Sequence, residues 1–401
     1  MKGDKLSKSG GFLIVVGLSL SLLSCTPGPA DPVEDLHKKA LVWDAHSDIV
    51  QSIMMQDLVF SDWNEVSFED IPRMQAGGLD VQVFALWPDP IYYPRRAARR
   101  TLQLIDVQLR AFERSPDKIE LARTAADVER ITRSGKIAAL LSIEGGHAIE
   151  DDLSLLRMYH RLGVSSLTLT HTKSIGWADS SGGEVLWDGL NEFGEQVVLE
   201  MNRLGMVIDV SHVSDAAFYD VLRVTRHPVI ASHSNCRALS DHPRNLTDEM
   251  ILALAENGGV QCITCEPNYL SQGYWDARRK ITRESSESSE TPETRPDDLD
   301  EWAIQRELAP RIIPDYPFPT IEDLFAHIDH VVKLVGVEHV GLGHDYSIMY
   351  KGPAGLEDVS KYENITRGLR ERGYADGDIK KILGGNLMRI WREVTDSNRK
   401  E

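Results

Sequence analysis

The chain has 401 residues and a formal net charge of −18, with 42% hydrophobic and 26% charged residues. These proportions are those of an ordinary globular protein, and the length suits two or three small domains or a single barrel with long loops. Because polyanions are held by surfaces rich in lysine and arginine, so negative a charge argues against nucleic acid as a partner.

The first 24 residues read as a lipoprotein-type signal peptide. Three lysines precede an apolar run from Gly11 to Leu23, which is too short for a comfortable membrane span. The run ends in Leu22-Leu23-Ser24-Cys25, which resembles the bacterial lipobox and implies cleavage before Cys25 and lipid attachment to it. The alternative is a plain signal peptide or anchor helix with an incidental cysteine.

This interpretation sets the expected location of the mature protein. Residues 25–35 include a stretch rich in proline and glycine, which is typical of a short tether. We therefore expect an exported protein that is attached to a bacterial membrane, on its periplasmic or cell-surface side, through a lipid anchor only.

From residue 40 onward, short β-rich runs alternate with helical patterns, which predicts βα units and a parallel sheet. The eight runs are Leu41–Ala45, Leu79–Trp87, Ile137–Ile143, Ser165–Thr170, Met206–Ser211, Pro228–Ser232, Gly259–Thr264 and His339–Gly343. Helical periodicity is readable over Glu195–Leu204, Thr247–Glu256 and Ile321–Val335, each followed within two residues by a glycine. Because eight parallel strands close a barrel, we expect an α/β protein with one (β/α)8 TIM-type barrel over residues 36–395.

Two features depart from this alternation. Residues 284–300 are acidic, rich in serine and almost free of apolar side chains, so we expect either a solvated insertion or a lid over the mouth of the barrel. Cys262 and Cys265 form a CxxC pattern within the seventh run. Residues three apart in a strand face opposite sides, so we expect buried, unpaired thiols there.

Side chains that bind metals gather at the carboxyl ends of the expected strands, where a barrel brings its catalytic groups together. His46 and Asp48 follow the first run and are two residues apart, so both can point to the barrel mouth. Glu144 follows the third run, and His212 and His233 follow the fifth and sixth. Three imidazoles and two carboxylates are the mixture expected of a two-metal hydrolytic site. Zinc is the natural ion, and manganese, iron or cobalt suit the same groups.

These residues and their neighbours resemble the membrane dipeptidase (renal dipeptidase) family over roughly Leu36 to Arg392. The segments that carry the resemblance are Asp44–Asp48, Ser142–His147, Leu167–His171, Glu200–His212, Ala231–Ser234, Arg244-Asn245 and Gly384–Arg389. The resemblance implies a zinc-dependent dipeptidase with a barrel of the metal-dependent hydrolase type and two Zn²⁺ ions per chain. It places His46 and Asp48 on one ion, His212 and His233 on the other, and Glu144 between them.

The same resemblance implies roles for three further residues. His171 would contact the scissile carbonyl or its oxyanion, Arg244 would hold the terminal carboxylate of the substrate, and Asp345 would transfer the proton. A bridging hydroxide activated by the metal pair would then attack the peptide bond of a small dipeptide. Structural roles are the alternatives for His171 and Asp345, and a surface salt bridge is the alternative for Arg244. The family also implies a possible homodimer.

The chain departs from the family pattern after Asp345. The family commonly continues with an aromatic residue and then Asp-Gly, whereas this chain reads Tyr346-Ser347-Ile348, so we expect a substrate pocket of different shape. Two other functions are compatible with the motifs. One is a different binuclear-metal amidohydrolase, acting on a cyclic amide, a lactone or a phosphoester; the other is a non-catalytic lipoprotein that binds peptides or metal. Arg244 favours dipeptides, because those other reactions have no general need for a carboxylate clamp.

Overall fold

The computed structural model describes residues 1, 31–56, 58–65, 67–288, 318–346 and 352–396. Residues 2–24 of the predicted signal peptide and Cys25 lie outside these residues, as do positions 289–300 of the predicted insertion. The predicted tether is too long at its far end, because helix α1 (Pro32–Lys39) begins inside it. Proline at the first helical position and the Asp31 side chain, which accepts a hydrogen bond from the Val33 amide at 2.9 Å, start that helix.

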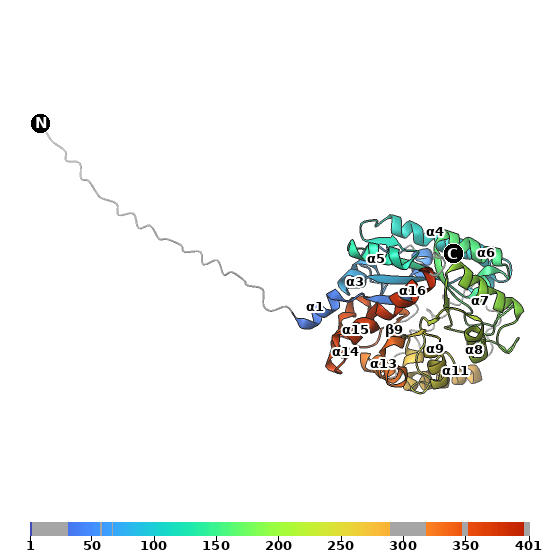
Figure 1. Ribbon diagram of the computed structural model, residues 1–401. Helices are drawn as coiled ribbons and strands as arrows, with labels where there is room; N and C mark the ends of the chain where they lie inside the picture. The colour runs from blue at the N-terminus through green and yellow to red at the C-terminus, as the bar shows by residue number, and fades with distance from the viewer. Residues whose placement is uncertain (2–30, 57, 66, 289–317, 347–351, 397–401) are drawn as a thin grey trace.

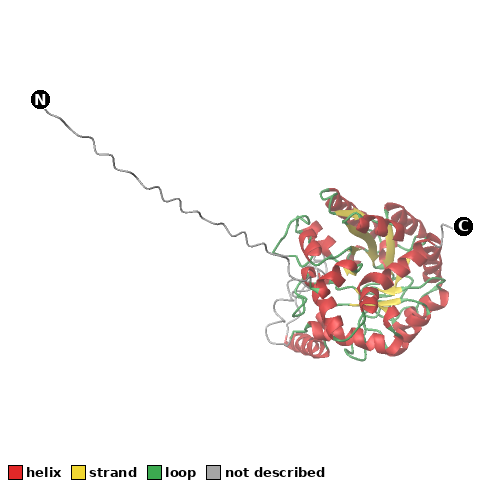
Figure 2. Ribbon diagram, turned by 60° about the vertical axis from the view of Figure 1, so that its left-hand side comes forward, coloured by secondary structure: helices red, strands yellow, loops and turns green. Residues whose placement is uncertain are grey.

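Eight parallel strands follow one another in chain order and form a nearly closed barrel with helices around it (Figures 1 and 2). The strands are β1 (Trp43–Ser47), β2 (Val81–Leu86), β4 (Ile137–Glu144), β5 (Val164–Thr168), β6 (Val207–Asp209), β7 (Ile230–Ala231), β8 (Val260–Ile263) and β9 (Val340–Leu342). Each corresponds to one predicted run, so the predicted barrel is confirmed. The sequence did not predict β3 (Ile119–Leu121), a three-residue strand that pairs with the start of β4.

The two end strands of the sheet meet at the mouth of the barrel. Within the described residues no ladder pairs β9 with β1, but the Asp345 amide donates a hydrogen bond to the His46 carbonyl at 3.4 Å. Gly343 lies at this junction, where a Cβ atom would stand 1.8 Å from the Ser232 carbonyl oxygen. Only glycine allows the end of β9 to come so close to the residue that follows β7.

The helices of the described residues are α1, α2 (Ile49–Met55), α3 (Ile71–Ala76), α4 (Ala97–Glu113), α5 (Ala125–Arg133), α6 (Leu153–Leu162), α7 (Glu192–Leu204), α8 (Asp215–Val224), α9 (Asp248–Glu256), α10 (Pro267–Leu270), α11 (Gln272–Ser288), α13 (Ile321–Val335), α14 (Glu363–Glu371), α15 (Asp376–Lys380) and α16 (Asn386–Asp396). Short helical turns are η1 (Pro90–Tyr92), η2 (Gly146–Ile149), η3 (Val337–His339), η5 (Val359–Lys361) and η6 (Lys381–Gly385). Helices α7, α9 and α13 confirm the three predicted ones. Helix α11 runs to Ser288, so the first five residues of the predicted insertion are helical.

Helix α16 closes the end of the barrel opposite the mouth. Its apolar residues share one buried cluster with inward-facing residues at the amino ends of the strands, including Val81 and Val260. Trp391 of α16 and Trp43 of β1 are both fully buried, with ring centroids 5.0 Å apart. Cys262 and Cys265 are buried and free, as predicted. Among the described helices, none combines the length and the apolar character needed to cross a membrane.

Truncating the tryptophan at the centre of this closure should destabilise the whole barrel. Replacing Trp391 by alanine opens a cavity in a fully buried cluster, and we expect a loss of about 3–5 kcal/mol in the free energy of unfolding. Urea unfolding followed by circular dichroism measures it. Trp63→Ala is the matched control, because Trp63 is 53% exposed and its loss should lower the midpoint much less.

Candidate metal centre

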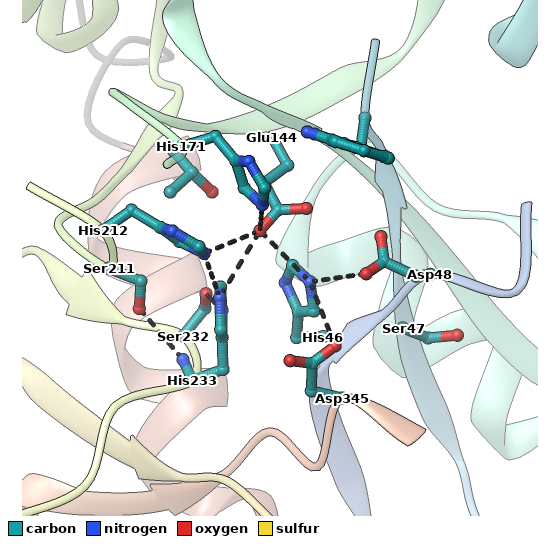
Figure 3. Close-up of polar contacts among 12 residues, drawn as sticks. His46, Ser47, Asp48, Glu144, His171, Ser211, His212, Ser232, His233 and Asp345 are labelled. Atoms are coloured by element: carbon teal, nitrogen blue, oxygen red, sulfur yellow. Dashed lines mark hydrogen bonds and ion pairs between the residues drawn. The ribbon is translucent and has the colours of Figure 1, made fainter. Parts of the chain in front are cut away.

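Glu144, the last residue of β4, stands at the centre of the barrel mouth (Figure 3). Its Oε1 atom lies 3.0 Å from Nε2 of His212, 3.4 Å from Nε2 of His233, 3.6 Å from Nε2 of His46 and 3.9 Å from Nε2 of His171. The carboxylate is 2% exposed. Side chains from four strands therefore converge on one buried oxygen atom.

His46 links this carboxylate to two more. Its Nε2 atom lies 3.9 Å from Oδ2 of Asp48 and 3.9 Å from Oδ1 of Asp345. The five predicted ligands are thus brought together, and the two predicted catalytic residues lie beside them. Ligand atoms within 4.8 Å of one another form three overlapping sets: His46, Glu144 and His233; Glu144, His171 and His212; and His46, Asp48 and Asp345. By distance, His171 and Asp345 are also able to reach an ion.

Several buried polar atoms of this cluster fit a divalent cation better than they fit one another. Nε2 of His46, Oε2 of Glu144 and Oδ1 of Asp48 are buried and have no hydrogen-bond partner among the described residues. Nε2 of His212 and Nε2 of His233 face each other at 2.8 Å, which requires a proton or a cation between them. Since buried polar groups are normally satisfied, these atoms have the arrangement expected of metal ligands.

The electrostatics of the protein without metal lead to the same conclusion. Burial, reinforced by the neighbouring Asp48 carboxylate, raises the pKa values of Glu144 and Asp345. Burial lowers the pKa values of His171, His212 and His233 well below the ordinary value. Divalent cations remove the need for protons on such crowded carboxylates and use the lone pairs of neutral imidazoles.

The residues next to His233 fix which of its ring nitrogens faces the centre. The Ser232 hydroxyl donates to Oδ2 of Asp209 at 2.6 Å and lies 2.7 Å from Nδ1 of His233. Because that hydroxyl proton is already used, Nδ1 carries the proton and donates to Ser232. Nε2 is left with a lone pair directed toward Glu144, which is the tautomer that a metal ligand needs.

Two residues of the centre have a strained backbone. His212 has φ 69° and Asp345 has φ 61°, a left-handed region that side chains other than glycine rarely adopt. The loop after β5 holds the first of them, since the Ser181 amide donates to the His212 carbonyl at 2.8 Å and the Ser180 hydroxyl lies between the carbonyls of His171 and His212. The rest of the fold therefore imposes these conformations.

Asp44 and His147, which lie in the same sequence segments as the predicted metal ligands, hold backbone at the mouth. Oδ1 of Asp44 accepts from the His46 amide at 2.9 Å and from the His344 amide at 3.1 Å, and Oδ2 accepts from the Tyr362 hydroxyl. Asp44 therefore joins the ends of β1 and β9. Nε2 of His147 donates to the Pro88 carbonyl, which fixes the turn after β2.

Arg244 is buried, with 7% of its surface exposed. Its guanidinium donates to Oγ of Ser234 at 3.1 Å and to the His233 carbonyl at 3.2 Å, and it lies 5.1 Å from the centroid of the Tyr269 ring. No carboxylate of the described residues forms an ion pair with it. Arg244 therefore does not form a surface salt bridge, which was the alternative role for this residue. The positive charge of its guanidinium remains available beside His233, a predicted metal ligand.

A cavity of about 80 Å³ opens onto the centre. Besides predicted site residues, its lining includes Trp87, Thr172, Glu266, Asn268, Tyr269 and Arg278, none of which the sequence singled out. Trp87 ends the second expected strand and Glu266 follows the seventh by two residues, so a search of every strand end for side chains other than metal ligands would have found them. The pocket shape expected from the altered loop after Asp345 stays a prediction, because residues 347–351 lie outside the described residues.

Comparisons with known proteins agree with this geometry. The model of a family described as membrane dipeptidase, peptidase family M19, matches residues 30–401. A dipeptidase of Aspergillus oryzae is 34% identical over 379 residues, which cover 90% of this chain and 80% of that protein. A dipeptidase of Claviceps purpurea is 37% identical over 299 residues, covering 74% of this chain and only 60% of that relative's length. The crystal structure of the probable dipeptidase PvdM from Pseudomonas aeruginosa has a TM-score of 0.79 and 27% identity, covering 91% of this chain and 98% of that one.

The buried His147 should make stability depend on pH. Burial lowers its pKa to about 4, below the unfolded value of about 6.5. Between these values the unfolded chain binds a proton that the folded chain does not, so stability is lost as the pH falls through this window. In His147→Gln the glutamine amide can still donate to Pro88, and the free energy of unfolding should fall less steeply, by up to about 1.4 kcal/mol per pH unit. Urea unfolding of both metal-free proteins between pH 7 and 4 measures this difference, and equal slopes would contradict the assignment.

Proposed function

Because this chain belongs to the membrane dipeptidase family, peptidase family M19, and is a metallo-dipeptidase, we propose that it hydrolyses the peptide bond of small dipeptides with two zinc ions per chain. The observation that carries the proposal is the convergence of four imidazoles on one oxygen of Glu144, with Asp48 and Asp345 beside His46. Neither an isolated structural histidine nor a site that has lost its activity would explain so many buried nitrogen and oxygen atoms without hydrogen-bond partners in one place.

The ligand set of each ion follows from the family resemblance and is compatible with the distances. His46 and Asp48 would hold one zinc ion, His212 and His233 would hold the other, and Glu144 would bridge them. When bound there, a pair of zinc ions supplies a water nucleophile of lowered pKa and polarises the carbonyl oxygen of the substrate.

The protein's own groups account for the remaining chemistry. Asp345 lies 3.9 Å from the His46 ring nitrogen, and burial raises the pKa of its carboxyl group, which suits a group that accepts the nucleophile's proton and delivers it to the departing amine. Burial keeps His171 neutral, so its ring can donate a hydrogen bond to the developing oxyanion without carrying a charge. Arg244 would hold the terminal carboxylate, because its fork of donors matches a carboxylate in two places.

Size and location complete the proposal. The cavity of about 80 Å³ at the centre is far too small to admit a folded protein. The lipobox-like sequence before Cys25 supports export and lipid attachment, so the enzyme would act on dipeptides outside the cytoplasm, at a bacterial membrane.

A substrate panel tests the activity and the metal together. The chain from Thr26 onward, stripped with a chelator, should be inactive and should regain hydrolysis of L-L and L-D dipeptides when zinc is added. Longer peptides should be cleaved poorly, because the carboxylate clamp admits only the last peptide bond of a chain and the small cavity leaves little room for further residues on the amino side of that bond. Full occupancy by two zinc ions without cleavage of any dipeptide would redirect the proposal to another amidohydrolase reaction.

Removing the predicted clamp separates these chemistries further. Arg244→Ala should raise KM for dipeptides by about 10- to 100-fold, as expected when a charge-assisted hydrogen-bonded contact is lost, with a smaller effect on kcat. Arg244→Lys is the matched control, since it keeps the charge but not the fork, and it should recover part of the loss. An unchanged KM in Arg244→Ala would mean that the carboxylate binds elsewhere or that the substrate has none.

A further inference from the structure

A second hollow of the molecule lies away from the metal centre, between helices α2 and α4 on the outside of the barrel. Two adjoining cavities of about 380 Å³ and about 640 Å³ share Met54, Val107 and Arg110 in their linings. Neither cavity shares a residue with the one at the metal centre. We call these two cavities the α2–α4 groove.

The α2–α4 groove has an apolar part, which includes exposed apolar side chains. Ile53, Leu58 and Phe60 line it from the α2 side. Val59 and Leu102 also line it, with 49% and 46% of their surfaces exposed. Contiguous apolar surface of this kind on a soluble domain marks an interaction site more often than it marks an accident of packing.

The rim of the groove is positively charged, in contrast to the chain as a whole. Residues 95–114 contain six arginines and two acidic residues, whereas the whole chain carries −18. Arg99, Arg110 and Arg114 line the cavities and are exposed. Arg110 pairs with Asp106 at 3.0 Å, but Arg99 and Arg114 form no ion pair with any described residue. Unpaired cations around an apolar groove call for an occupant that is both anionic and apolar.

We propose that the α2–α4 groove and its arginine rim form a docking surface for an anionic lipid bilayer. Phosphate headgroups complement the arginines, and acyl chains complement the apolar lining and the exposed side chains around it. This choice of occupant rests in part on the lipidation of Cys25 proposed above, because the segment between Cys25 and Asp31 can span at most about 20 Å and would keep a lipid-anchored barrel close to the membrane. A second copy of the chain is less suitable, since a two-fold contact would bring the same arginines face to face.

Vesicle sedimentation tests the proposal with the zinc-loaded chain from Thr26 onward, which keeps every element of the barrel and lacks the lipid. It should bind vesicles made of equal parts of phosphatidylglycerol and phosphatidylcholine, bind pure phosphatidylcholine weakly, and be released as salt is raised. Removing two charges in Arg99→Gln/Arg114→Gln should weaken binding about 25-fold, at about fivefold for each arginine. The matched control is Arg226→Gln, because Arg226 is an exposed arginine far along the chain at the end of α8, and it should bind as the parent does.

The apolar part of the surface has its own variant. Leu102→Ser should also weaken binding to the anionic vesicles, while dipeptide hydrolysis in solution stays at the parent rate in every variant and shows that the barrel is intact. Equal binding to both kinds of vesicle, or no effect of the double arginine variant, would overturn the proposal. So would a dimer that dissociates in Leu102→Ser in the absence of lipid, which would assign the groove to a second copy of the chain.

Discussion

The architecture of the barrel mouth depends on one electrostatic problem, the burial of the Glu144 carboxylate among four imidazole rings and beside two further carboxylates. A charge in such a place is costly unless it is paired, and the described residues offer it imidazole nitrogens but no lysine or arginine at ion-pair distance. Divalent cations resolve the problem because they satisfy carboxylate oxygens and imidazole lone pairs together. The same crowding that would be a defect in an ordinary core is therefore the reason that this mouth suits metal ions.

Holding these groups together requires rigidity, and the fold supplies it from several directions. Asp44 joins β1 to β9 where their ladder is absent, Ser232 and Asp209 orient His233, and the loop after β5 holds His212 in a left-handed backbone conformation. At the opposite end, α16 buries Trp391 against Trp43. Strain is concentrated at the mouth, where ligands must be aimed, and apolar packing is concentrated at the closed end, where it stabilises the barrel.

The outer surface adds a separate layer of organisation. The chain as a whole has a net charge of −18, but α4 carries arginines, and some of them line the α2–α4 groove. The proposed docking follows this charge distribution, because an anionic membrane attracts a face that carries arginines. The groove and the cavity at the metal centre share no lining residue, so they are separate sites.

The sequence by itself determined the eight strands that follow one another around the barrel, and it placed the predicted metal ligands at one end of that barrel. Parallel strands have their carboxyl ends at one end of the barrel. Chain order alone therefore places at the mouth the predicted ligands that lie at or next to strand ends, namely His46, Glu144, His212 and His233. The sequence did not determine the walls of the cavity or the groove. Glu266 and Arg278 lie on segments whose path over the mouth depends on how α10 and α11 pack, and β3 is too short to show a pattern. Nor did periodicity indicate the left-handed backbone of His212 and Asp345, or bring α2 beside α4. The local sequence pattern predicts where strands and helices form. Loop paths and contacts between distant helices are decided by burial in the complete tertiary structure.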